Sequence, residues 1–161
     1  MALLSGRTAN MAWWAGYTFV GLLLQVHFPG VDALVPGLIL SLQEERPRQT
    51  AWLFFLFLLI QEGTGSLVFG SAVLWYCGLF VLFAFGKIFF VTGSLFFTVI
   101  LAATLGVFHV ALMHTLGSLQ GFSLSPYLLA EQAVTQALLI PPLYAAASLA
   151  RKRLLTYEYG I

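Results

Sequence analysis

Long apolar runs with very few charges are the feature that most constrains how this chain can fold. Apolar residues make up 60% of its 161 positions and charged residues 8%, about a third of the charged share of an ordinary soluble domain. A helix needs about 20 apolar residues to cross a bilayer. The pattern therefore predicts an all-α integral membrane protein whose residues 1–161 form a single membrane domain. The net charge of +1 predicts no nucleic-acid binding.

Polar, glycine and proline residues divide the apolar sequence into six segments, which predict a compact bundle of six transmembrane helices. The breaks include Phe28-Pro29-Gly30, the charged cluster at 44–48 and Gly86-Lys87. The second and third segments are short, so a re-entrant hairpin is the competing interpretation. It would place the charged cluster at the bilayer centre, at a cost of about 2.5–3.5 kcal/mol per charge, so we expect both segments to cross. The expected spans are residues 10–27, 31–43, 49–62, 66–86, 88–116 and 126–150.

The positions of the lysine and arginine residues predict the orientation of this bundle. If all six segments cross, the seven cationic residues lie on one side of the membrane. Cytoplasmic loops carry an excess of such residues, so we expect this side, and with it both termini, to be cytoplasmic. The seven are Arg7, Arg46, Arg48, Lys87, Arg151, Lys152 and Arg153.

An acidic, glycine-rich stretch closes the third segment on the opposite side. Asp32 and Glu62 both fall at this water boundary, where a charge needs no partner. A second interpretation is that Glu62, Gly65, Ser66 and Gly70 form a partner-binding edge, because small residues let another helix approach closely. The small residues would otherwise pack within the bundle. The same choice applies to Ala102, Gly106, Ala133 and Ala137.

His109, Glu131 and Gln136 form the candidate polar site inside the membrane. A buried His109 near Glu131 would make a minimal proton relay, whereas the ordinary interpretation is a histidine that bonds to a neighbouring helix. The three histidines lack the spacing of metal ligands, and no catalytic motif is present. We therefore expect no metal, no cofactor and no enzymatic activity. Pro141 and Pro142 predict a kink or break in the sixth segment.

Residues 31–76, VDALVPGLILSLQEERPRQTAWLFFLFLLIQEGTGSLVFGSAVLWY, resemble the bacterial rod shape-determining protein MreD family. In that family an acidic start leads to a short second span, a basic loop and a span that ends in an acidic or Gln-Asp pair. A Gly-Ser turn and a glycine-containing fourth span follow. Here Gln61 or Glu62 stands where the family most often has Asp, and one residue is added between Gly65 and Gly70.

The resemblance implies a non-enzymatic scaffold subunit of the bacterial cell-elongation complex, which synthesises peptidoglycan. It would be a multi-pass protein of the inner membrane, surrounded by lipid. Its partners would be an MreC-like protein and, with it, MreB, RodA and a class B transpeptidase. Two alternatives stay open: a substrate-binding membrane subunit of a small-molecule, vitamin-type transporter, and a small proton-coupled carrier. A closed polar cavity would favour the binding subunit, and an open lateral groove lined by apolar side chains would favour the scaffold.

Overall fold

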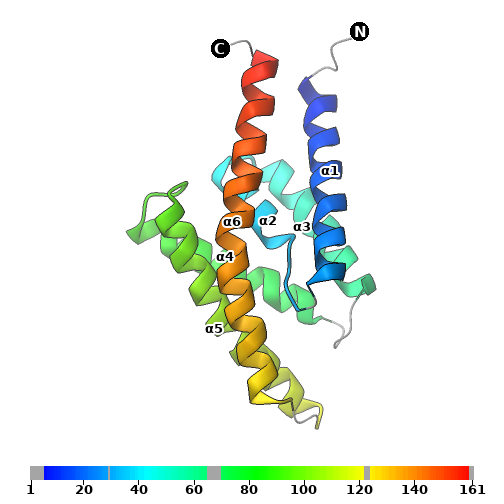
Figure 1. The fold of residues 1–161 in the computed structure, drawn as a ribbon, viewed down its shortest axis with the longest axis vertical. Helices are drawn as coiled ribbons and strands as arrows, with labels where there is room; N and C mark the ends of the chain where they lie inside the picture. The colour runs from blue at the N-terminus through cyan, green and yellow to red at the C-terminus, as the bar shows by residue number, and fades with distance from the viewer. Residues whose placement is uncertain (1–5, 29, 65–69, 122–123, 160–161) are drawn as a thin grey trace.

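The computed structural model of the chain describes residues 6–28, 30–64, 70–121 and 124–159. In these residues the chain forms six helices and no strand, so the prediction of an all-α fold is confirmed. α1 begins and α6 ends at one end of the molecule, whereas α5 ends and α6 begins at the other (Figure 1). The helices are α1 (Gly6–His27), α2 (Val35–Gln43), α3 (Pro47–Thr64), α4 (Ser71–Phe89), α5 (Leu95–Leu119) and α6 (Pro126–Tyr159).

Three helices in the described part of the chain, rather than the six predicted, are long and apolar enough to cross a membrane. They are α4, α5 and the part of α6 from Pro126 to Leu154. α2 has nine residues, a rise of about 14 Å, so this helix by itself is too short to span a hydrocarbon core of about 30 Å. α1 and α3, with 22 and 18 residues, are long enough to be candidate spans. Polar residues such as Asn10 and Gln49 lower their mean hydropathy.

The predicted second span began at residue 31, four residues before α2 starts. The difference arises because the Asp32 carboxylate accepts a hydrogen bond from the backbone N–H of Leu34 at 2.9 Å. This turn, closed by the aspartate side chain onto the backbone two residues later, competes with the helix. At the other end of α2, Glu45 adopts a φ of 53° and the chain reverses into α3.

The boundary between the fourth and fifth segments also lies later than predicted. α4 continues to Phe89, and α5 starts at Leu95 rather than at residue 88. Ser94 caps α5, since its hydroxyl accepts a hydrogen bond from the N–H of Phe97 at 3.1 Å. Serine before an apolar run is a common helix start. Gly93 supplies the turn between the two helices with a φ of 95°.

α5 and α6 form a close helix pair. A Cβ atom at Gly106 of α5 would lie 2.9 Å from the carbonyl oxygen of Ala133 in α6, so the two backbones are nearly in contact. This confirms internal packing for these two small residues. α6 continues as one helix through Pro141 and Pro142, so the helix is not broken there.

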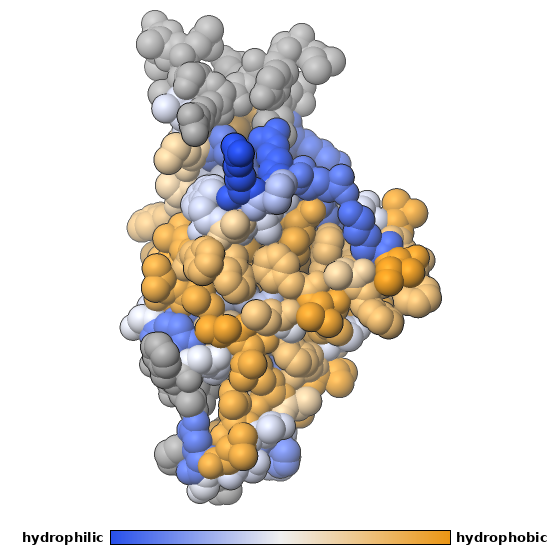
Figure 2. All heavy atoms as spheres, turned by 180° about the vertical axis from the view of Figure 1, so that it is seen from behind, coloured by the Kyte–Doolittle hydropathy of each residue, from blue (hydrophilic) through white to orange (hydrophobic). Residues whose placement is uncertain are grey.

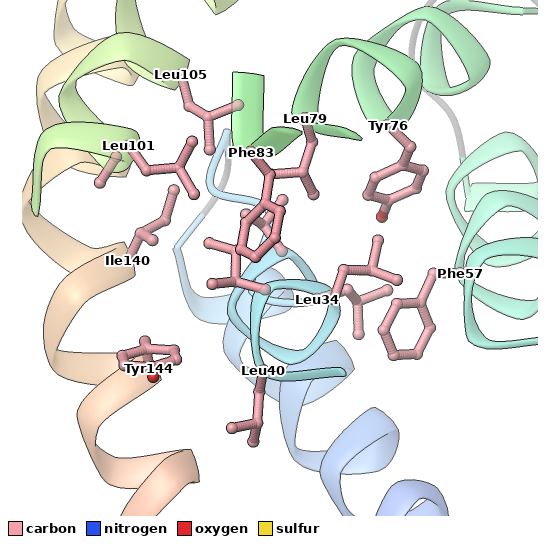
Figure 3. Close-up of a cluster of buried hydrophobic side chains, with 14 of the residues drawn as sticks. Leu34, Leu40, Phe57, Tyr76, Leu79, Phe83, Leu101, Leu105, Ile140 and Tyr144 are labelled. Atoms are coloured by element: carbon pink, nitrogen blue, oxygen red, sulfur yellow. The ribbon is translucent and has the colours of Figure 1, made fainter. Parts of the chain in front are cut away.

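The hydrophobic core surrounds α2, in which every residue from Val35 to Ser41 is buried. Figure 3 shows Leu34, at the start of α2, beside Phe57 of α3 and Tyr76 of α4, while Ile140 of α6 closes the opposite side. Many large apolar side chains are exposed around this core. Figure 2 shows a broad hydrophobic band across one face of the molecule, with hydrophilic residues gathered above it toward the end where α1 begins and a smaller group toward the opposite end. This distribution is that of a membrane protein.

Candidate functional site

Asp32 joins three parts of the chain in the loop between α1 and α2. Its side chain is buried, with 7% of the residue exposed. One carboxylate oxygen accepts hydrogen bonds from the N–H of Leu34 and from the side-chain amide of Gln25 in α1, the latter at 3.0 Å. The other oxygen accepts from the indole N–H of Trp75 in α4 at 3.1 Å. The prediction that Asp32 simply marks the water boundary is therefore wrong, because the fold encloses its side chain.

A cavity of about 440 Å³ lies beside Asp32. Residues from α1, the loop after it, α3, α4, α5 and α6 line it, so nearly the whole fold contributes to its wall. The wall combines apolar surface, as from Leu22 and Met113, with several polar side chains. The polar lining includes Gln25, Asp32, Gln61, Ser71, His109 and Gln136.

His109 of α5 connects this cavity to α6. Its Nε2 lies 3.2 Å from the side-chain oxygen of Gln132, and its Nδ1 lies 3.3 Å from the side-chain nitrogen of Gln136. An amide oxygen can only accept and an amide nitrogen can only donate. These partners therefore assign the hydrogen to Nε2 and a neutral ring to His109. The rings of His109 and Trp75 are nearly perpendicular, with 5.4 Å between ring centroids.

Gln136 has one side-chain atom in use and one without a partner. Its nitrogen donates to the carbonyl oxygen of Gly30 at 2.9 Å, as well as facing His109. Its side-chain oxygen is buried and has no hydrogen-bond partner among the residues that the structure describes. Buried polar atoms in native proteins are nearly always bonded, so this oxygen is a candidate contact for a bound group.

Only part of the predicted intramembrane site comes together. His109 and Gln136 are in contact, but Glu131 lies on the exposed surface of α6. Gln132 takes the place expected for Glu131. Residues four apart share one helix face, whereas residues five apart do not. The four-residue spacing of Gln132 and Gln136 could thus have indicated the two partners of His109, and the sequence analysis missed it.

Glu62 binds the start of α4 within its own chain. Its two carboxylate oxygens accept hydrogen bonds from the N–H of Gly70, each at 3.1 Å, and one also accepts from Ala72 at 3.1 Å. A carboxylate at a helix N-terminus is stabilised by the helix dipole. Gly70 has a φ of 93°, and a Cβ there would meet nothing within 4 Å, so its backbone conformation explains the glycine. Gly65 and Ser66 lie outside the described residues, and partner binding by the four residues stays a prediction.

A second polar cluster lies at the other end of the core and centres on Arg151 of α6. Arg151 is 2% exposed and forms a two-point ion pair with Glu44, with Nε–Oε1 at 2.8 Å and Nη2–Oε2 at 3.2 Å. Its guanidinium carbon also lies 4.9 Å from the centre of the Trp13 ring and 5.4 Å from that of Trp14. Such cation–π contacts add to the stability of a buried arginine.

Two amide side chains close this cluster into a ring. Arg151 donates to the side-chain oxygen of Asn10, Asn10 donates to Gln49 at 3.1 Å, and Gln49 donates to Glu44 at 2.7 Å. Burial raises the pKa of Glu44, but the hydrogen bonds from Arg151 and Gln49 outweigh it and hold the pKa below its ordinary value. The ring ties α1, α3, α6 and the turn after α2 together. Sequence reasoning treated these residues only as ends of spans.

The described residues contain no group of three or more His, Cys, Asp or Glu side chains that could hold a metal ion. No family model, curated protein or solved structure matches this chain. Its function must therefore be inferred from its own residues and their arrangement.

Proposed function

We propose that this chain is a non-enzymatic scaffold subunit of the bacterial cell-elongation complex, located in the inner membrane. This is the role implied by the resemblance of residues 31–76 to the MreD family. Its partners would be an MreC-like membrane protein and, with it, MreB, RodA and a class B transpeptidase. In a bundle of helices joined by short loops, helix faces, loops and the cavity are the surfaces available to such partners.

The observation that carries this proposal is that the residues behind the resemblance meet in space. Asp32 and Trp75 stand near the two ends of the segment and share a hydrogen bond. Gln61 lines the cavity beside Asp32, while Glu62 caps α4 through Gly70. These contacts join described residues from both ends of the segment beside the buried α2. We expect proteins that make the same contacts to carry these residues in the same order along the chain, which is the order that the resemblance rests on.

In the proposed topology the chain crosses the membrane six times, through the segments of α1, α2 and α3 as well as through α4, α5 and α6. Both termini are then cytoplasmic. Two contacts support placing the cationic residues on one side. Lys87, near the end of α4, pairs with Glu45 at 2.7 Å, and Arg151 of α6 pairs with Glu44. The contacts bring the end of α4 and the second half of α6 to the turn between α2 and α3. The cations Arg46 and Arg48 flank the start of α3 beside this turn.

Purification from native membranes tests this proposal. We expect the tagged chain to carry an MreC-like protein with it, and depletion of the chain to turn rod-shaped cells round. Glu62→Gln should weaken this co-purification modestly, because Glu62 already bonds to the start of α4 in its own chain and an ion pair near the surface contributes about 0–1 kcal/mol. Glu131→Gln, which also neutralises a carboxylate, is the matched control and should retain the partner. Rod-shaped cells after full depletion, or purification without any elongation protein, would refute the scaffold function.

The polar cavity favours a second candidate, a substrate-binding subunit of a small-molecule transporter. A cavity of about 440 Å³ with Asp32, His109 and Gln136 in its wall is within the size range of small-molecule sites. The proton-coupled carrier has less support, because His109 bonds to Gln132 and Gln136 while Glu131 is exposed. Saturable binding of a small solute by the purified chain, with no elongation protein in native membranes, would favour this second function.

A further inference from the structure

The Asp32 carboxylate is buried without a cationic partner in the described part of the chain. The ion pairs found there join Lys87 to Glu45 and Arg151 to Glu44, and neither involves Asp32. Its hydrogen-bond donors, from Gln25, Leu34 and Trp75, are all neutral groups, and so are the nearby polar side chains of Gln61 and Tyr76. A carboxylate removed from water is costly unless it is paired with a positive charge or protonated. Each of these groups donates its hydrogen to an oxygen of Asp32, which favours the charged carboxylate over the protonated one. The site therefore favours a positive group beside Asp32.

The rest of the cavity wall favours the same kind of group. Among the residues that the structure describes, Asp32 is the only acidic one in the wall, and no Lys or Arg lines it. The side-chain oxygen of Gln136 supplies a second acceptor, buried and without a partner in these residues. An ammonium group has three N–H donors and no acceptor, so it matches a wall that offers acceptor oxygens.

The size and the apolar part of the wall argue for an organic ligand rather than a bare metal ion. The volume of about 440 Å³ is near the lower end of the range for small-molecule sites. Leu22, Val26 and Met113 provide apolar surface, which a metal ion would not use. Among the described residues, the acidic and histidine side chains also do not form a metal-binding group.

We propose that the cavity beside Asp32 binds the ammonium group of a small organic amine. That chemistry can come from a free amine or from the headgroup of phosphatidylethanolamine in the surrounding bilayer. The inference goes beyond the scaffold function and does not depend on it. It also gives the second candidate function a ligand class.

The test uses the full chain, purified in detergent and freed of phosphatidylethanolamine. Ethanolamine, ethylene glycol and glycolate share a two-carbon frame and differ in charge, so they separate the cation from a neutral and an anionic ligand. We expect ethanolamine to raise the melting temperature in a saturable way and the other two to have no effect at equal concentration. Asp32→Asn should weaken ethanolamine binding at least tenfold, whereas Glu131→Gln, on the exposed surface, should leave it unchanged.

A second variant keeps the test decisive if Asp32→Asn does not fold. Ser71→Leu extends an apolar side chain from the cavity wall, leaves Asp32 in place, and should also abolish ethanolamine binding. In nanodiscs, retention of phosphatidylethanolamine by the unmodified chain but not by these variants would assign the ammonium to the lipid. Ethanolamine binding without lipid retention would assign it to a free amine.

Three results would overturn the inference: no binding of either ammonium source, equal binding of glycolate, or undiminished binding by a folded Asp32→Asn variant. None of them bears on the co-purification of an MreC-like protein. The amine site and the scaffold function can thus fail separately.

Discussion

The contact between α5 and α6 allows a stability prediction whose magnitude follows from one distance. In Gly106→Ala, the new Cβ would lie 2.9 Å from the backbone oxygen of Ala133 and 3.7 Å from its Cβ. A backbone atom cannot rotate away as a flexible side chain can, so α5 and α6 must separate slightly. Overpacking of this kind typically costs about 1–3 kcal/mol. Alanine also stabilises a helix relative to glycine by about 1 kcal/mol, which partly hides the cost.

Gly16→Ala is the control that removes this second effect. Gly16 lies inside α1 and is exposed, and a Cβ atom added there would meet nothing within 4 Å. Both variants gain the same helix propensity, so the difference between them isolates the steric cost at Gly106. For a chain of this size 1 kcal/mol corresponds to about 2–4 °C. Gly106→Ala should therefore melt roughly 2–12 °C below Gly16→Ala.

The assay is thermal unfolding of both variants in the same detergent and at the same scan rate, because membrane proteins often unfold irreversibly. Circular dichroism at room temperature should show equal helix content, which confirms that both variants fold. Equal melting temperatures, or a higher value for Gly106→Ala, would refute the close approach of the α5 and α6 backbones.

The other predictions concern the Arg151 cluster and the topology. Arg151→Met should destabilise the chain by at most about 3–5 kcal/mol, because it removes the cationic partner of the partly buried Glu44 carboxylate. Arg153→Met, at an exposed site, should have little effect, and equal melting temperatures of the two variants would contradict the ion pair. Since the Glu44 pKa is lowered in the folded chain, the stability that it contributes is present at neutral pH and is lost as the pH falls through this lowered value. Glu44→Gln should therefore show a smaller fall in melting temperature between about pH 6 and pH 3, and an unchanged pH profile would count against this assignment. In a cysteine-free background, a cysteine at Arg48 should resist an impermeant thiol reagent in intact cells while one at Gly121 reacts; external labelling at position 48 would reverse the proposed orientation.

Hydropathy was enough to predict the helical class and the approximate positions of the long helices. The predicted segments 88–116 and 126–150 overlap α5 and α6 over most of their length. Hydropathy succeeds here because the free energy of placing a helix in hydrocarbon is largely the sum of contributions from consecutive residues. Gly106 and Ala133 were likewise identified as helix-contact residues, either within the bundle or toward a partner, because small residues let two helices approach closely.

The interactions that organise the interior depended on the tertiary structure. Asp32 meets Trp75 across 43 positions, and Arg151 meets Glu44 across 107. A hydropathy pattern does not report contacts between distant residues. From the sequence, Asp32 and Glu44 therefore looked like residues at a water boundary. Helix packing encloses them, and the cost of burying a charge then makes their hydrogen bonds and ion pairs decisive. The short length of α2 also depends on tertiary structure. The Asp32 side chain forms a turn where the first turn of the predicted helix would lie, and the longer helices around α2 bury it.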